Sequence, residues 1–388
     1  MSITVKAADA AQFLAFVPRL LGCTPRESLV LVPLASGRSV GALRVDLPPA
    51  DAVESVASAA IGMLCRVAEV DAFAAVVYTD ASIGSSEDDL GHSPPTGRTP
   101  RLPGGALIDA LRVRADACGL RIVDLLTVAS DGWGSHDDDE LPPGGRPLRS
   151  IRVPAAAAGA LAASGAVARG DQASGAALPR VGQQARRAVA EAISSLGAAL
   201  EAVCGVPASP RRATRIDPAA LEAVGELDDL ACLFEEALCW STPLAPMRAA
   251  MLGWCLARPA LRDIALVQWA TDQDGGDVAT EAQRRWEAGE DYPSDLAEVM
   301  WGDGYRPDPD RLGTALTLAR EVAALVPKAM RPGPLSMCAW LAWALGRSTH
   351  ADRYAAMALS IDRRHGLAGI VRTFVNAGHL PDWAFRPR

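Results

Sequence analysis

The chain has 388 residues, of which 49% are hydrophobic and 22% charged, so it is long enough for two domains with separate cores and is typical of a folded globular protein. Its formal net charge of −8 lacks the basic footprint that a general nucleic-acid-binding protein needs. No apolar run reaches the length of a membrane span and the first residues lack a signal-peptide pattern. We therefore expect a cytoplasmic protein with no nucleic-acid or membrane partner.

A hairpin organises the N-terminal half of the chain. The apolar, β-branched run from Ser28 to Leu34 predicts a strand that is buried on both faces. Residues 36–38 supply a turn, and residues 40–47 return as a second strand until Pro48 ends the ladder. Together with a short helix that starts near Phe13, this hairpin is predicted to be the nucleus of a sheet.

Helices and strands alternate after the hairpin. A capping-box pattern predicts a helix over residues 51–67, and an apolar run predicts a strand over 73–78. The polar stretch 81–103 is too long for an ordinary connection, which indicates either disorder or a functional loop. A helix over 105–118 and a strand over 121–129 follow. This order predicts an α/β domain with a mixed sheet.

The eight cysteines contain no C-x-x-C pair, which argues against a structural zinc site and a disulfide framework. Five of them lie within apolar helical patterns, where free cysteine behaves as a small hydrophobe. These five are Cys65, Cys118, Cys232, Cys255 and Cys338.

The composition changes between Pro154 and Ala177, where alanine and glycine dominate. We place the domain boundary there, with an α/β domain over residues 1–178 and an all-helical domain over 179–388. Eight of the nine tryptophans lie in the second half, mostly at core-facing helical spacing. Near the C-terminus, the small residues between 346 and 358 resemble the second half of a tetratricopeptide-type hairpin, of which at most one unit is visible.

Three segments together resemble one known family. They are PRLLGCTPRESLVLVPL (18–34) with RVDLP (44–48), the turn at 131–133 with Gly144-Gly145, and the C-terminal helices around 339–346 and 358–362. On these segments the chain resembles the actinobacterial domain of unknown function 4192 family. The resemblance implies a bacterial cytoplasmic protein and brings no established activity. Relatives carry aromatic residues after the glycine of the second segment, whereas this chain has Trp133-Gly134-Ser135-His136 in what is expected to be a loop.

The usual catalytic signatures are absent from the sequence, including a Gly-Lys phosphate loop, H-E-x-x-H, G-x-G-x-x-G after a strand and a G-x-S-x-G elbow between a strand and a helix, since the G-R-S-V-G match at residues 37–41 lies in the predicted hairpin. Topology leaves one candidate constellation. If the strands at 40–47, 73–79 and 121–129 are joined through helices, the right-handed crossover rule makes them parallel. Asp46, Asp80 and Asp131 then lie at the carboxyl ends of parallel strands, at the edge where open α/β sheets bind ligands.

This edge is predicted to bind a small ligand, with Arg44, Trp133 and His136 beside the three aspartates. Asp46, Asp80 and Asp131 are also the candidate ligands for a divalent cation such as Mg²⁺, since hard cations favour carboxylate oxygens. No other cofactor is evident. The alternative is that each aspartate only forms a turn or a cap, that Arg44 pairs with Asp46, and that the acidic run 137–140 is a solvated loop.

The sequence favours a non-enzymatic interaction or scaffold module whose helical domain binds a protein partner. The alternative is a metal-dependent hydrolase or a small-ligand sensor that uses the carboxylates at the sheet edge. Catalytic residues are not identified by either interpretation.

Overall fold

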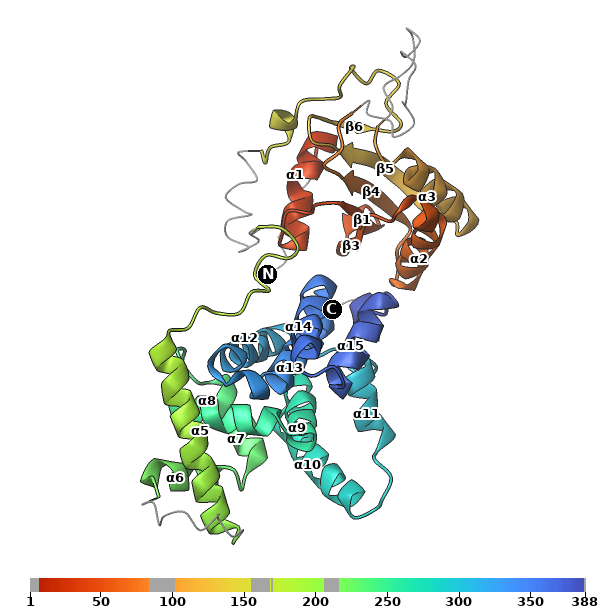
Figure 1. The fold of residues 1–388 in the computed structure, drawn as a ribbon. Coiled ribbons are helices and arrows are strands. Elements are labelled where there is room, and N and C mark those ends of the chain that lie inside the picture. The colour runs from red at the N-terminus through yellow and green to blue at the C-terminus, as the bar shows by residue number, and fades with distance from the viewer. Residues whose placement is uncertain (1–6, 84–101, 155–167, 169, 206–215, 387–388) are drawn as a thin grey trace. The chain divides into compact units, whose positions relative to one another are not determined.

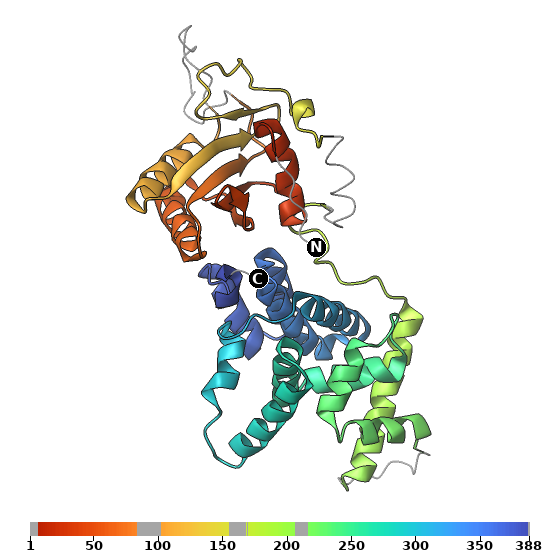
Figure 2. The same ribbon diagram turned by 180° about the vertical axis from the view of Figure 1, so that it is seen from behind.

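The computed structural model describes residues 7–83, 102–154, 168, 170–205 and 216–386 (Figures 1 and 2). Most of the predicted loop 81–103 lies outside these residues. The chain divides into two compact units, residues 1–175 with 385–388 and residues 176–384. This division falls within the alanine- and glycine-rich segment, three residues before the expected boundary.

The N-terminal unit contains a six-stranded mixed sheet. Its strands are β1 (Ser28–Ala35), β2 (Arg38–Ser39), β3 (Leu43–Asp46), β4 (Ala72–Tyr78), β5 (Arg121–Val128) and β6 (Trp133–Ser135). β1 pairs with β2, β3 and β4 in antiparallel fashion, β4 and β5 are parallel, and β5 and β6 are antiparallel. The predicted mixed α/β sheet is confirmed. The segment expected to be a loop at 133–136 instead contributes the edge strand β6.

β1 lies between β3 and β4, the two strands that the crossover rule predicts to be parallel. Ser28 is the register partner of both Asp46 on β3 and Tyr78 on β4, and Tyr78 is in turn paired with Val128 on β5. β3 and β4 therefore point in the same direction, as expected, but they are separated by an antiparallel strand. The start of β1 consequently lies at the same edge as the ends of β3, β4 and β5.

Helices cover both faces of this sheet (Figures 1 and 2). α1 (Ala10–Leu21) covers one face, and α2 (Val53–Arg66) and α3 (Gly105–Ala117) cover the other. Short 3-10 turns occur at Ala50–Ala52 and Leu148–Ser150. Each face of the sheet has its own apolar layer, because alternate residues of β1, β4 and β5 point to opposite sides.

The second unit is helical. Its helices are α5 (Gln183–Val203), α6 (Pro218–Glu226), α7 (Leu230–Leu238), α8 (Pro246–Leu256), α9 (Pro259–Ala270), α10 (Gln273–Glu287), α11 (Ser294–Trp301), α12 (Pro309–Leu325), α13 (Pro332–Ala344), α14 (Ser348–Ile361) and α15 (Gly366–Asn376), with 3-10 turns at Lys328–Met330 and Asp382–Phe385. Every residue of α13 is buried, and this helix packs against α8, α9, α12, α14 and α15. α13 is therefore the centre of the helical core.

The approach of α13 to α8 requires glycine. A Cβ atom on Gly333 would lie 2.0 Å from the carbonyl oxygen of Leu256, which is far inside van der Waals contact. Within the part of the chain that the structure describes, no helix has the length and hydropathy of a membrane span.

The cysteines correct part of the sequence interpretation. Cys255 and Cys338 are buried in the helical core, as predicted, and Cys232 is half-buried. Cys65 and Cys118 are exposed, so the prediction that they pack in the core is wrong. Both lie near the C-terminal ends of α2 and α3, where the neighbouring Leu64 and Ala115 are buried in the apolar layer and the two cysteines are not.

Candidate functional site

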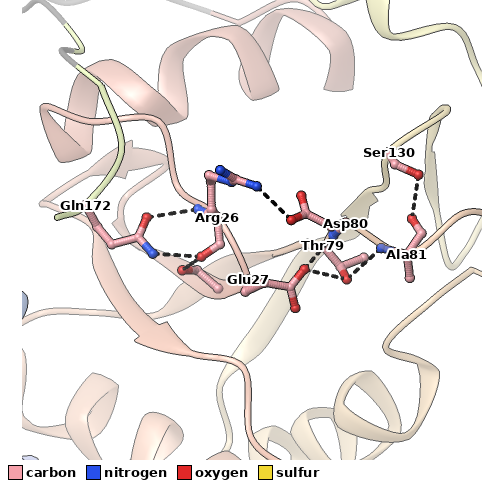
Figure 3. Close-up of polar contacts among 8 residues, drawn as sticks. Arg26, Glu27, Thr79, Asp80, Ala81, Ser130 and Gln172 are labelled. Carbon is pink, nitrogen blue, oxygen red and sulfur yellow. Dashed lines mark hydrogen bonds and ion pairs between the residues drawn. The ribbon is translucent and has the colours of Figure 1, made fainter. Parts of the chain in front are cut away.

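The candidate site is the edge of the sheet where β1 begins and where β3, β4 and β5 end (Figure 3). Asp46 is the last residue of β3, Asp80 follows β4, and Asp131 follows β5. The structure thus places the three predicted aspartates at one edge. It adds Arg26 and Glu27, which directly precede the antiparallel strand β1.

Glu27 connects the strand ends at this edge. Its carboxylate oxygen Oε1 accepts hydrogen bonds from Thr79 Oγ1 at 3.0 Å and from the backbone N–H of Asp80. Its carbonyl oxygen accepts a hydrogen bond from the N–H of Leu47 at 2.9 Å. The backbone of Glu27 has φ +42°, in the left-handed region that is costly for a residue with a side chain. One residue therefore ties the ends of β3 and β4 to the start of β1.

Arg26 and Asp80 form an exposed ion pair, with Arg26 Nη2 2.8 Å from Asp80 Oδ2 (Figure 3). The side chains are 60% and 66% exposed, so the pair contributes little to stability. The backbone of Arg26 is held by Gln172, whose Oε1 accepts from its N–H at 3.1 Å and whose Nε2 donates to its carbonyl at 2.9 Å. The guanidinium is thus presented to solvent from a fixed backbone.

Asp46 pairs with Arg44, as the alternative interpretation predicted. Arg44 Nη1 also donates to Ser28 Oγ at 3.0 Å, and its side chain is only 13% exposed, whereas that of Asp46 is 77% exposed. Asp131 has a partner as well, because its Oδ1 accepts the backbone N–H of Ile83 at 3.0 Å. This bond joins the segment after β5 to the segment after β4, 48 residues away in the sequence, so it is not the local turn that an aspartate after a strand commonly forms.

The three aspartates therefore share an edge but have separate partners. Across the described residues, no three or more His, Cys, Asp or Glu side chains gather as a set that could hold a metal ion. The strand order also differs from that of a ligand-binding crevice in an open α/β sheet. The two crossovers, through α2 and α3, proceed in the same direction and lie on the same face, so the described strands contain no point where the order reverses.

Trp133 and His136 bond to groups other than these aspartates. The Trp133 ring is buried in the apolar layer under α1, and its Nε1 donates to Ser150 Oγ at 2.9 Å. The N–H of His136 bonds the carbonyl of Leu125, three residues before the end of β5, and its Nε2 lies 2.9 Å from Thr127 Oγ1. Burial lowers the pKa of His136 to about 4, so the imidazole is neutral at neutral pH.

Sequence reasoning missed Arg26, Glu27 and Gln172. A signal existed for the first two, since a charged pair directly precedes a buried strand that must run antiparallel to its hairpin partner. No sequence signal indicates Gln172, which reaches Arg26 across 146 residues.

The helical unit exposes aromatic side chains that the core-packing interpretation did not anticipate. Trp286 on α10 is 54% exposed, Trp301 at the end of α11 is 50% exposed, and Tyr305 is 99% exposed. Trp269, Trp340 and Trp343, by contrast, are fully buried, as predicted for helix-packing tryptophans.

A family model described as Domain of unknown function (DUF4192) matches residues 11–290, well over half of the chain. The match covers the whole described sheet and the helices from α5 to α10, and it ends before α11. No curated protein and no solved structure matches the chain.

Proposed function

We propose that this chain, which belongs to the DUF4192 family, is a non-enzymatic interaction module that binds a protein partner through its helical unit. The observation that carries the proposal is the exposure of Trp286, Trp301 and Tyr305 within one stretch of 20 residues on that unit. Tryptophan and tyrosine are enriched in protein interfaces and dominate their binding energy. Large aromatic side chains that stay in water are therefore the best candidates for partner contacts.

The packing of the helical unit supports a rigid platform. α13 and α14 form a helical hairpin in which Ala351, Ala355 and Ala358 are fully buried, so the two helices approach closely. Such close packing of small residues supports the tetratricopeptide-like end that the sequence predicts, which stays a prediction. A preorganised helical surface binds with little loss of conformational entropy.

The test uses the full chain as bait and quantifies stoichiometric partners from a lysate of the source organism by mass spectrometry. The partner is then purified and titrated against wild type, Trp286→Ser and Tyr305→Ser. Val113→Ser is the matched control, because it removes an apolar side chain that is 64% exposed on the N-terminal unit. We expect at least one aromatic substitution to weaken binding about tenfold or more, and the control to leave it unchanged. A chain that retains no stoichiometric partner would refute the proposal.

A second function, a small-ligand sensor at the sheet edge, is favoured by the exposed Arg26–Asp80 pair, which presents a cation and an anion side by side. The sensor form has more support than the metal-dependent hydrolase, since Asp46, Asp80 and Asp131 each have a separate partner. The test is a thermal melt with Mg²⁺, Mn²⁺, Zn²⁺ and nucleotides. A ligand at a hundredfold excess over its Kd stabilises the chain by about 2.7 kcal/mol, a gain that Asp80→Asn and Asp46→Asn should abolish. Binding that persists in both variants would place the ligand elsewhere.

A further inference from the structure

The topology of the N-terminal unit brings two cysteines together. β3, β4 and β5 point in the same direction, and α2 and α3 are the two connections between them, so the helices run parallel to each other. They pack side by side on one face of the sheet, and their C-terminal ends therefore lie together (Figure 1). Cys65 is the penultimate residue of α2, and Cys118 is the C-cap of α3.

Both thiols are accessible and close enough to interact. Cys65 and Cys118 are exposed to solvent. Partial burial, and then a hydrogen bond and charge interaction with the Cys118 thiol, raise the pKa of Cys65. The two thiols thus lie within interaction range of each other at the surface, whereas Cys255 and Cys338 are enclosed in the helical core.

We propose that Cys65 and Cys118 form an oxidisable dithiol, which a hydroperoxide converts to a disulfide that links α2 to α3. In the first step the thiolate of one cysteine attacks a peroxide oxygen of hydrogen peroxide. An S–O bond forms, the O–O bond breaks, and hydroxide leaves and takes up a proton to become water. The product is a sulfenic acid.

In the second step the thiolate of the other cysteine attacks the sulfenic sulfur. An S–S bond forms, the S–O bond breaks, and the leaving hydroxide becomes a second water. Two thiols are oxidised and one hydrogen peroxide is reduced to two waters. The sulfurs move to about 2.05 Å from each other. Because both residues lie where their helices end, this adjustment falls on the helix ends and not on the sheet.

The experiment exposes the fully reduced wild-type chain to hydrogen peroxide, alkylates the remaining thiols and digests the protein without reduction. We expect mass spectrometry to find a peptide that links Cys65 to Cys118, and a thiol titration under denaturing conditions to show the loss of two of the eight thiols. Cys118→Ser should abolish the linked peptide. Cys204→Ser, which removes another exposed cysteine, should leave it in place.

Two results would overturn the proposal. One is oxidation of Cys65 or Cys118 to sulfinic acid in the wild-type chain with no linked peptide. The other is a linked peptide that joins different cysteines. Neither result depends on whether a variant folds, because both are measured on the wild-type chain.

Discussion

Glu27 offers the sharpest test of how the sheet edge is held. Its carboxylate accepts bonds from Thr79 Oγ1 and the N–H of Asp80, while its backbone lies in the left-handed region. Two substitutions separate these properties. Glu27→Ala removes the carboxylate and keeps the unfavourable backbone, whereas Glu27→Gly removes the carboxylate and relieves the backbone.

The expected magnitudes follow from these contacts. Each of the two hydrogen bonds to the exposed carboxylate contributes about 1 kcal/mol, so Glu27→Ala should lower the free energy of unfolding by about 2 kcal/mol. A non-glycine residue in the left-handed region costs about 1–2 kcal/mol, and the greater freedom of unfolded glycine cancels part of the relief. Glu27→Gly should therefore be less harmful than Glu27→Ala, with a loss of about 1 kcal/mol.

The assay is amide hydrogen exchange with mass spectrometry, since it reports each unit separately. We expect amides of β1 and β4 to exchange about thirtyfold faster in Glu27→Ala and about fivefold faster in Glu27→Gly, which are the factors for about 2 and about 1 kcal/mol at 25 °C. Exchange in α13 should not change, because α13 belongs to the other unit.

Glu69 provides the matched control. It is exposed and has φ +63°, and within the described residues its side chain forms no hydrogen bond or ion pair. Glu69→Ala should be neutral, and Glu69→Gly should stabilise the unit by about 1 kcal/mol. If Glu27→Gly exchanges as fast as Glu27→Ala, the backbone argument is refuted; wild-type exchange in both variants would refute the role of the carboxylate.

Three further outcomes are expected. Gly333→Ala should destabilise the helical unit by about 3 kcal/mol in urea unfolding, whereas Gly313→Ala on α12, whose Cβ would meet no atom within 4 Å, should be neutral or stabilise it by up to about 1 kcal/mol. Because the pKa of His136 is about 4 when folded and about 6.5 when unfolded, the stability from its neutral form is complete above pH ~6.5 and is lost as the pH falls towards 4, by up to about 3 kcal/mol. Melts from pH 7 to 4.5 should show a smaller loss in His136→Gln. The Cys65–Cys118 disulfide closes a loop of roughly 50 residues and should raise the free energy of unfolding by about 4 kcal/mol, as measured by urea unfolding with and without reductant.

The strands of the N-terminal unit were predictable where the chain is rich in apolar residues. The predicted strand at 28–34 corresponds to β1, the one at 73–78 to β4 and the one at 121–129 to β5. The placement of β1 between β3 and β4 was not predictable, because it depends on pairing between strands that are distant in sequence and equally apolar. The crossover rule fixes the direction of β3 relative to β4 and does not exclude a strand between them.

The candidate site was predictable in position and not in composition. Direction alone places Asp46, Asp80 and Asp131 at one edge, and the structure has them there. The sequence does not determine which groups these aspartates bind, since an aspartate that follows a strand suits a turn, an ion pair or a metal equally well. Glu27 acquires its role from the antiparallel direction of β1, because this direction brings the start of β1 to the edge where β3 and β4 end.

The extent of the family match divides the exposed aromatic residues of the first proposed function. The sheet edge, with Arg26 and Asp80, lies inside the matched residues 11–290, and so does Trp286. Trp301 and Tyr305 lie outside them. Of the contacts proposed above, only the sheet edge and Trp286 can therefore serve a function that belongs to the family as a whole. If Trp286→Ser weakens partner binding and Tyr305→Ser does not, the interaction lies within the family domain; the reverse result would assign it to the C-terminal helices that follow that domain.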